Sequence, residues 1–298
     1  MVCELRRFGD PENNFWGRPN DIRSDRPPIG ERSKMTVCIA ATCRMASADP
    51  QLILCTDWKT SSALGSAETH FKQRILRPDG TWHALTSGTE SDILPLIQCL
   101  KNEFNKDGIR VDDTNITGLI RNAILNRKKE KSDEYIISRF GMTYDDFVAI
   151  GKSKFPDDLF RSTITRIGDI QINAELVVAG FNGSFPVLCE TNQRGEVKIR
   201  EDFAVAGEGG YLATAVLLHR KHGELNEIAE SLYAVYEAKK YSERLGSVGT
   251  DTTIRIINKE GKARLTSFST RMWLQELYVK YSPKDIDEKL VLPDDYLD

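Results

Sequence analysis

The sequence predicts an α+β fold, a four-layer αββα sandwich in which two antiparallel sheets stack face to face and helices flank them. Three observations lead to this prediction. Strand-like and helix-like segments follow the order strands, helices, strands, helices, strands, which is segregated rather than alternating. Turn signals join neighbouring strands into hairpins. Two stacked sheets with helices outside them would bury the apolar face of every element.

The first strands occupy the segment that begins at Thr36. TVCIAA (36–41) and LILCTD (52–57) are short apolar runs that predict a buried hairpin. Residues 58–69 are polar and predict a loop. HFKQRIL (70–76) alternates apolar and basic side chains, which is typical of a half-buried strand. After the turn signal PDG, TWHALTSG (81–88) predicts a fourth strand.

Helices follow this first group of strands. Thr89, Ser91 and Asp92 form a cluster suited to N-capping of the first helix. Apolar residues recur at helical spacing in the second, and Pro156 opens the last one. The predicted helices span 91–104, 114–130, 132–140 and 155–168.

Strand signals return after residue 173. NGS at 182–184 is a hairpin turn, and KEGK at 259–262 joins the last two strands. The predicted strands span 174–181, 185–191, 196–207, 250–258 and 263–269. Two amphipathic helices, 210–223 and 225–242, lie between them and are separated by Gly223.

Three regions differ in patterning. Residues 1–35 are rich in Arg, Asp, Pro and Gly without a period, which predicts a flexible leader or propeptide-like extension. Residues 36–270 carry the patterned domain. Residues 271–298 form a C-terminal tail with one possible helix and an acidic end.

Composition excludes several classes of function. The 298 residues include 41 Lys+Arg and 44 Asp+Glu, a formal net charge of −3, so a basic nucleic-acid-binding protein is excluded. No apolar run approaches the ~18 residues of a membrane helix, and no signal-peptide pattern follows the N-terminus. We therefore expect a cytoplasmic protein without a membrane or nucleic-acid partner.

Metal and nucleotide sites are not expected either. The six cysteines lack CxxC spacing and predict buried thiols in a reducing compartment. His219 and His222 share a helix face but lack a nearby acidic third ligand. GKS at 151–153 lacks the glycine that a phosphate loop needs, because Asp146 stands there. No metal or other cofactor is predicted.

One group of residues could form a catalytic site. Two adjacent hairpins would bring together Thr36, Asp57, Lys72, Arg74 and Gly88. If Thr36 were a chain terminus, its α-amine could act as the base for its own hydroxyl. A buried basic residue would lower the pKa of that amine, and a carboxylate would hold the basic residue. A backbone N–H in a glycine turn could bind the developing oxyanion.

Four segments, in this order and spacing, resemble the proteasome β-type subunits and bacterial proteasome-like proteins of the N-terminal-nucleophile hydrolase superfamily. The resemblance covers roughly residues 36–268. The segments are TVCIAA with LILCTDWKTSS, FKQRIL with TWHALTSGTESD, FAVAGEGGYLATAVLL, and AKKYSERLGSVGTDTTIRIIN. The resemblance implies that Thr36 is the nucleophile, Asp57 the carboxylate, Gly88 the oxyanion donor and Ser242 the supporting serine.

The basic residue stays open between Lys72 and Arg74, which share a strand face. An arginine would stay cationic and could not shuttle a proton. Two further positions depart from the family pattern: Glu208 replaces a serine and Lys239 replaces an aspartate, and we hypothesise that they pair. The segment 127–172 resembles an insertion.

Thr36 is useful as a nucleophile only if its amine is free. The residues before it are Lys34 and Met35, not the glycine at which the family removes its propeptide. Translation from Met35 followed by removal of that methionine would expose Thr36. Alternatively, the leader is a genuine cap that silences the site.

The resemblance implies a threonine peptidase that cuts peptide or unfolded-protein substrates through an acyl-enzyme. It also implies a homo-oligomer, either a ring or an open helix, and leaves any ATPase partner unknown. The alternative is a catalytically inactive proteasome-like subunit that builds or gates an assembly. A third hypothesis is an amidase of the same superfamily that acts on small amides, with Cys38 or another terminus as its nucleophile.

Overall fold

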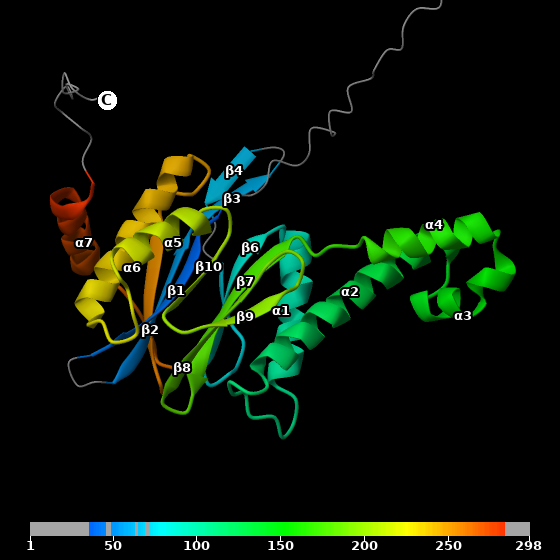
Figure 1. Ribbon diagram of the computed structural model, residues 1–298, viewed down its shortest axis with the longest axis horizontal. Helices are drawn as coiled ribbons and strands as arrows, with labels where there is room; N and C mark the ends of the chain where they lie inside the picture. Colours follow the sequence, from blue (N-terminus) through cyan, green and yellow to red (C-terminus); the bar gives the residue numbers. More distant parts are fainter. Residues whose placement is uncertain (1–35, 46–48, 63–64, 69–71, 284–298) are drawn as a thin grey trace, which may run out of the picture.

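The computed structural model describes residues 36–45, 49–62, 65–68 and 72–283 (Figure 1). The predicted leader 1–35 lies outside the described residues, as does the acidic end of the predicted tail. Among the described residues, no helix is both long and apolar enough to cross a membrane.

Two five-stranded sheets form the centre of the molecule, and all of their neighbouring strands are antiparallel. The first sheet has the order β10 (Phe203–Ala206), β1 (Cys38–Arg44), β2 (Pro50–Asp57), β11 (Thr252–Asn258) and β12 (Ala263–Leu265). The second has the order β5 (Gln73–Ile75), β6 (Trp82–Gly88), β7 (Ala174–Asn182), β8 (Phe185–Thr191) and β9 (Val197–Arg200).

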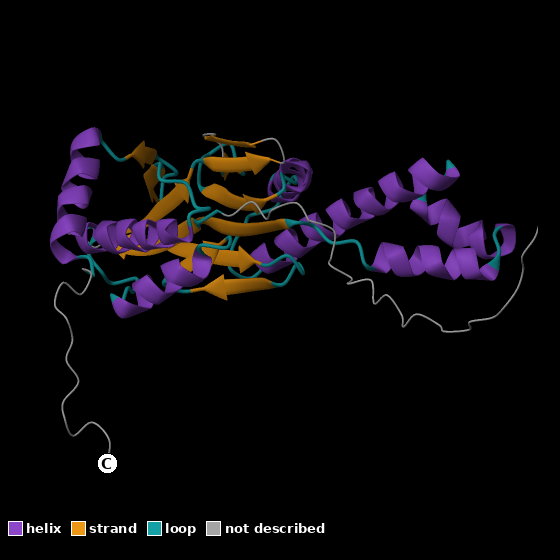
Figure 2. Ribbon diagram, turned by 90° about the horizontal axis from the view of Figure 1, so that it is seen from above, coloured by secondary structure: helices purple, strands orange, loops and turns teal. Residues whose placement is uncertain are grey.

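Helices cover the outer face of each sheet (Figures 1 and 2). Those on the first sheet are α5 (Gly210–His219), α6 (Ile228–Ser242) and α7 (Phe268–Tyr281), and those on the second are α1 (Glu90–Phe104) and α2 (Ile116–Phe140). The short helix η1 (Glu243–Leu245) follows α6. This arrangement confirms the predicted αββα sandwich.

The core has three layers of apolar side chains because both faces of each sheet are covered. On β1, Ile39 faces the α5–α6 layer, whereas Cys38 and Ala40 face the other sheet. Leu54 of β2 and Leu188 of β8 meet in that middle layer. Burial on both faces explains why these strands read as continuous apolar runs rather than as alternating ones.

The predicted strand 196–207 is divided in the structure, which corrects that prediction. β9 belongs to the second sheet and β10 to the first, so the chain crosses between the sheets at Glu201 and Asp202. The backbone carbonyl of Asp202 accepts hydrogen bonds from the amide (2.9 Å) and the hydroxyl (2.9 Å) of Thr42, and these fix the crossing. The crossing delivers the glycine-rich turn that follows β10 to the start of β1.

Other predicted bounds also change. The first strand begins two residues later than expected, at Cys38, and a small hairpin of β3 (Lys59–Ser62) and β4 (Gly65–Glu68) replaces a predicted loop. α2 is one continuous helix of 25 residues where two helices were expected.

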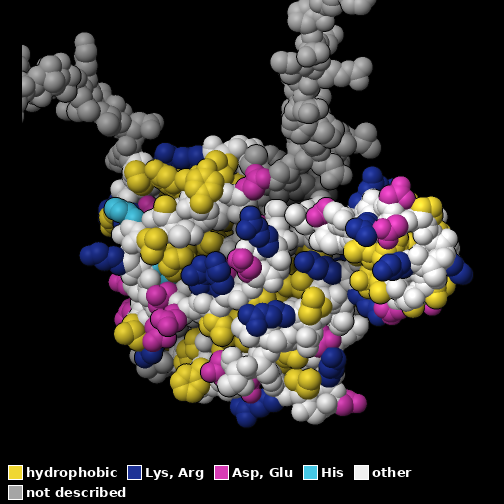
Figure 3. Space-filling model, turned by 45° about the vertical axis from the view of Figure 1, so that its right-hand side comes forward, with side chains coloured by type: hydrophobic (Ala, Val, Ile, Leu, Met, Phe, Trp, Pro, Cys, Tyr) yellow, Lys and Arg dark blue, Asp and Glu magenta, His cyan; other side chains and the backbone are white. Residues whose placement is uncertain are grey.

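The segment 127–172 forms an arm that projects from the sandwich (Figure 1). It consists of the second half of α2, α3 (Tyr144–Lys154) and α4 (Asp157–Gly168). An aromatic cluster holds its helices together, with ring centroids 5.0–5.7 Å apart, formed by Phe140, Phe147, Phe155 and Phe160. In Figure 3 the arm stands out as a separate knob on which hydrophobic side chains lie among charged ones.

α7 begins within the predicted domain and continues into the predicted tail. Its Leu274 is buried against α6, and the hydroxyl of Tyr236 donates a 2.6 Å hydrogen bond to Oε1 of Gln275. The helix is therefore packed onto the first sheet's helical layer, and the boundary drawn at residue 270 falls inside it.

Candidate active site

Thr36 lies at the edge of the sandwich, immediately before β1, and is buried. Its backbone carbonyl accepts a 3.1 Å hydrogen bond from the amide of Gly209, in the turn that precedes α5. Gly207 of the same turn has a φ of +87°, and a Cβ there would fall 2.2 Å from the Thr36 carbonyl oxygen. Only glycine allows the turn to approach Thr36 this closely.

Lys72 is the basic residue that meets Thr36. Its Nζ donates to Oγ1 of Thr36 at 2.7 Å and to Oδ1 of Asp57 at 2.7 Å. The Lys72 carbonyl accepts hydrogen bonds from the amide (2.9 Å) and the hydroxyl (3.2 Å) of Thr86, which fixes the backbone just before β5. The Lys72 side chain is only 11% exposed, so the contact between its charge and Asp57 is weakly screened.

Asp57 ends β2 and its side chain is fully buried. Besides Lys72, its Oδ1 accepts the Val37 amide at 3.2 Å, and its Oδ2 accepts the Gly249 amide at 3.0 Å. A buried carboxylate is tolerated because these donors replace its water shell. Sequence reasoning missed both amides, since backbone donors leave no residue signature; the only signal was the small-residue run SVGTD.

Of the two basic residues left open, Lys72 therefore faces the threonine. Arg74 lies within β5, opposite Ala84 of β6. Gly88 ends β6, has a φ of +128° and lies opposite Ala174. Its α-carbon packs against β7, where a Cβ would fall 2.0 Å from the Asn173 carbonyl oxygen.

The position of Ser87 shows where Gly88 lies relative to Thr36. A Cβ on Gly207 would fall 2.9 Å from the Ser87 hydroxyl as well as close to Thr36, so the end of β6 lies across the turn from the threonine. The Gly88 amide is one residue further along. Its role as an oxyanion donor stays a prediction.

Ser242 reaches Thr36 through the glycine-rich turn. Its buried Oγ lies 2.9 Å from the carbonyl oxygen of Gly209 and 2.9 Å from that of Ala238, one helical turn earlier. The amide of Gly209 binds Thr36, so Ser242 holds the turn that holds Thr36.

Lys239 pairs with Glu243 in the structure, not with Glu208 as hypothesised. Lys239 is fully buried, and its Nζ donates to Glu243 and to the carbonyl oxygens of Gly249 (2.7 Å) and Thr250 (2.9 Å). These three acceptors use all the protons of the ammonium group. Burial and the nearby carboxylate of Glu175 raise the pKa of Glu208.

Cys38 does not have the properties of a nucleophile. Its thiol is fully buried and donates to the Thr86 carbonyl oxygen at 3.4 Å. Burial raises the pKa of this thiol far above its usual value, whereas thiolate is the reactive form. Within the described ranges, no group of three or more His, Cys, Asp or Glu side chains could hold a metal ion.

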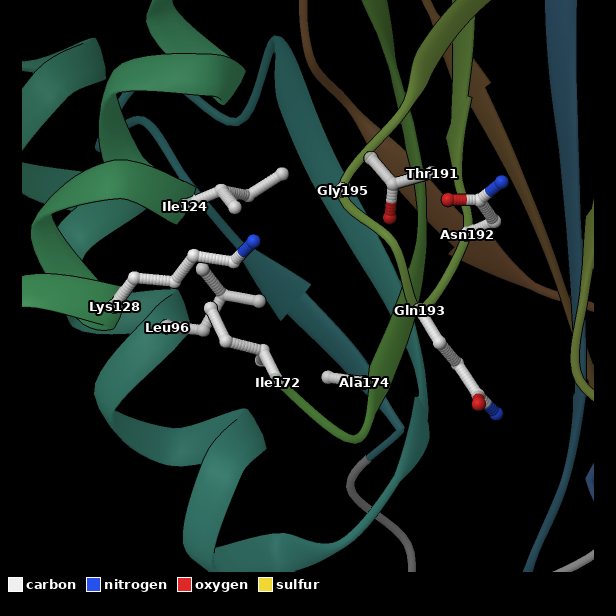
Figure 4. Close-up of a pocket in the computed structure, with 9 residues that line it drawn as sticks. All are labelled: Leu96, Ile124, Lys128, Ile172, Ala174, Thr191, Asn192, Gln193 and Gly195. Atoms are coloured by element: carbon white, nitrogen blue, oxygen red, sulfur yellow. The ribbon is translucent and has the colours of Figure 1, made fainter. Parts of the chain in front are cut away.

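Two cavities lie near this end of the molecule, and neither is lined by Thr36, Asp57 or Lys72. The first, between α1, α2 and the β8–β9 turn, has room for about one water (about 10 Å³) and is shown in Figure 4. The second measures about 120 Å³ and is lined in part by Glu175 and Val205. Glu175 adjoins the glycine-rich turn, because its Oε2 accepts the Gly207 amide at 2.8 Å.

Known structures share this sandwich. Three solved structures of Anbu proteins, which are proteasome-like, have a similar fold. Anbu (ancestral beta-subunit) from Yersinia bercovieri is 12% identical, with a TM-score of 0.54 over 82% of this chain and 94% of that one. Anbu from Hyphomicrobium sp. strain MC1 is 13% identical, with a TM-score of 0.54 over 86% of this chain and 100% of that one. The Gly-1 mutant of the latter gives a TM-score of 0.52 at 12% identity, over 83% and 98% of the two chains.

These likenesses correct the family expected from the sequence. Anbu proteins are proteasome-like but form a distinct family, so the expected assignment to the proteasome β-type subunits is wrong. At 12–13% identity the likeness extends to the fold alone. No protein-family model matches the chain. A search of curated proteins also finds no match.

Proposed function

We propose that this protein is a threonine peptidase that hydrolyses peptide bonds with Thr36 as an N-terminal nucleophile. One observation carries the proposal: the ammonium group of Lys72 lies 2.7 Å from both Oγ1 of Thr36 and Oδ1 of Asp57. A hydroxyl, a cation and a buried carboxylate in a row form the constellation of an activated nucleophile.

The chemistry follows from that row of groups. The free α-amine of Thr36 takes the proton from Oγ1, and Oγ1 attacks the carbonyl carbon of the scissile peptide bond. The cation of Lys72 stabilises the negative charge on Oγ1, while the hydrogen bond to Asp57 holds the Lys72 ammonium group in position. The amine then returns the proton to the leaving nitrogen as the peptide bond breaks and an ester forms on Oγ1. Water attacks the ester, releases the carboxylic acid and restores the hydroxyl.

This mechanism requires a chain that begins at Thr36. Start of translation at Met35, followed by removal of that methionine before a small residue, supplies such a chain. In a chain that begins upstream, the Thr36 nitrogen is part of a peptide bond, and an amide nitrogen cannot accept the proton.

We also propose that the protein acts on peptides or unfolded proteins within a homo-oligomer, as a ring or an open helix. Support comes from the solved relative from Yersinia bercovieri, whose description calls it an ancestral beta-subunit. Sedimentation analysis of the purified protein tests the assembly, and a single monomeric species would contradict it.

The alternative is a catalytically inactive assembly subunit. Two residues favour it: Glu208 replaces the serine that the sequence comparison implied beside the nucleophile, and Lys239 replaces the aspartate. Under this alternative, a chain that begins at Thr36 forms the same oligomer but cleaves nothing.

The deciding experiment uses protein that begins at Thr36 and a panel of short fluorogenic peptides. Thr36→Ala should abolish hydrolysis, and Thr36→Ser should retain it because serine keeps the hydroxyl. Thr42→Ser, a conservative change at a buried threonine of β1, the strand that Thr36 precedes, is the matched control. Equal hydrolysis by Thr36→Ala and the unchanged protein would overturn the proposal.

A further inference from the structure

Lys239 is a lysine buried completely inside the sandwich, on the last turns of α6. Its side chain reaches the segment between η1 and β11, where the carbonyl oxygens of Gly249 and Thr250 accept hydrogen bonds at 2.7 and 2.9 Å. The carboxylate of Glu243 is its third partner. A buried lysine is costly unless it is paired, so its presence here calls for an explanation.

The contacts of Lys239 require the charged form. All three partners are acceptors, and only an ammonium group carries three protons to donate. Glu243 supplies the compensating charge, and Lys240 also pairs with it at 3.0 Å. Glu243 would therefore keep one cationic partner if Lys239 were replaced.

Gly249 links this buried pair to the candidate active site. Its carbonyl oxygen accepts from Lys239, while its amide donates to Oδ2 of Asp57 at 3.0 Å. The next residue, Thr250, is held by the same ammonium group. One backbone residue thus touches Lys239 on one side and Asp57 on the other.

We propose that Lys239 is a positioning residue for the reaction, acting through the Gly249 backbone on Asp57 and so on Lys72. The inference rests on the proposed peptidase function. Lys239 holds the segment 246–251 so that the Gly249 amide meets Oδ2, which leaves Oδ1 to hold Lys72 against Thr36. Glu243 makes this arrangement possible because it neutralises the buried cation.

Lys239→Met tests the proposal, since methionine keeps an unbranched side chain but removes the ammonium group. Lys240→Met is the matched control: it removes the neighbouring lysine of the same helix and also loses a contact with Glu243, but does not touch Gly249. We measure kcat and KM on a fluorogenic peptide, and amide hydrogen exchange by mass spectrometry for a fragment covering 246–252.

Lys239→Met should lower kcat by about tenfold to a hundredfold, the effect of misplacing a catalytic group, with KM changed less than about twofold. Exchange of the 246–252 fragment should become at least about tenfold faster. Lys239→Arg, which keeps the charge, should recover part of kcat. Lys240→Met should change neither kcat nor the exchange rate of the 246–252 fragment.

If Lys239→Met does not fold, Glu243→Gln provides the second test, because it removes the compensating charge and keeps the shape. It should show the same fall in kcat and faster exchange of the same fragment. Unchanged exchange and unchanged kcat in either folded variant would overturn the proposal. If the unchanged protein cleaves no peptide, the proposed function fails, while the exchange comparison still decides whether Lys239 holds Gly249 in place.

Discussion

Nζ of Lys72 lies 2.7 Å from Oγ1 of Thr36, although the two residues are 36 positions apart in the chain. The contact joins the start of β1 in one sheet to the start of β5 in the other. It therefore depends on how the two sheets stack. A group that can stabilise a developing alkoxide is fixed in place before any substrate arrives, which is the condition for electrostatic catalysis.

Removal of the Lys72 charge should abolish most of the activity. We expect Lys72→Met to lower kcat/KM by about a hundredfold to a thousandfold, because the charge on Oγ1 loses its stabilising cation. Lys72→Arg should not restore it, since the planar guanidinium group differs in shape from the ammonium group that contacts both Thr36 and Asp57. Arg74→Lys, two residues further along the chain, is the control and should keep most of the activity. Steady-state kinetics on fluorogenic peptides check this, and an active Lys72→Met would contradict it.

Asp57→Asn should weaken the fold as well as the site. It leaves the nearly buried Lys72 without its carboxylate, and breaking one side of such a pair costs about 3–5 kcal/mol. Urea unfolding of Asp57→Asn and of Asp49→Asn gives the comparison. Asp49 pairs with Lys259 at the surface, where solvent screens the pair and its contribution to stability is small. Equal losses in the two variants would contradict the buried role of Asp57.

Gly207→Ala should damage the site more than an ordinary glycine substitution. Both Gly207 and Gly108 have positive φ values, +87° and +75°, so alanine strains the backbone at either position. Only at Gly207 would the new Cβ fall 2.2 Å from the Thr36 carbonyl oxygen, whereas at Gly108 no atom of the described residues lies within 4 Å. We expect Gly108→Ala to cost about 1 kcal/mol of stability with activity kept, and Gly207→Ala to cost more and lose activity. Similar activities in the two variants would rule this out.

Asp92 should make stability depend on pH in the acid range. Burial alone would raise its pKa, but hydrogen bonds from Lys131 and from the Asn173 amide outweigh burial and hold the pKa below its usual value. The folded form therefore stays ionised where the unfolded chain takes up a proton. The stabilisation is complete above pH about 4 and is lost as the pH falls through the lower folded value.

Urea unfolding between pH 2.5 and 7 tests the role of Asp92. Asp92→Asn should show a shallower loss of stability below about pH 4 than the unchanged protein. Asp145→Asn is the matched control, because Asp145 also pairs with a lysine of α2, Lys129, but is largely exposed. An identical acid dependence in Asp92→Asn and the unchanged protein would show that Asp92 is not the group responsible.

The sandwich was predictable from the sequence because its signals are local. Hairpin turns such as NGS at 182–184 and apolar runs such as LILCTD can each be recognised within a stretch of about ten residues. The break between β9 and β10 was not predictable, because 196–207 carries one continuous strand pattern and only the stacking of the sheets decides where it divides. The hairpin of β3 and β4 was missed for a similar reason, since its strands are short and polar.

The candidate site was predictable in part. The order of the motifs predicted Thr36 and Asp57 and left the basic residue open between Lys72 and Arg74. Only the three-dimensional structure could decide between them, because Lys72 precedes β5 and the sheet geometry sets which side chain reaches Thr36. The hydrogen-bond partners of Lys239 could not be predicted from the sequence. Its partners Gly249 and Thr250 contribute backbone carbonyls, which every residue possesses.

The most direct test of the central claim is mass spectrometry of the protein from its own cell, before and after incubation with a peptide β-lactone. Such a lactone opens on an activated hydroxyl and leaves an ester there. The account predicts a chain that begins at Thr36 and gains one acyl group, mapped to Thr36 and absent from Thr36→Ala. A chain that begins upstream of Thr36, or one that begins at Thr36 and is not acylated, would contradict it.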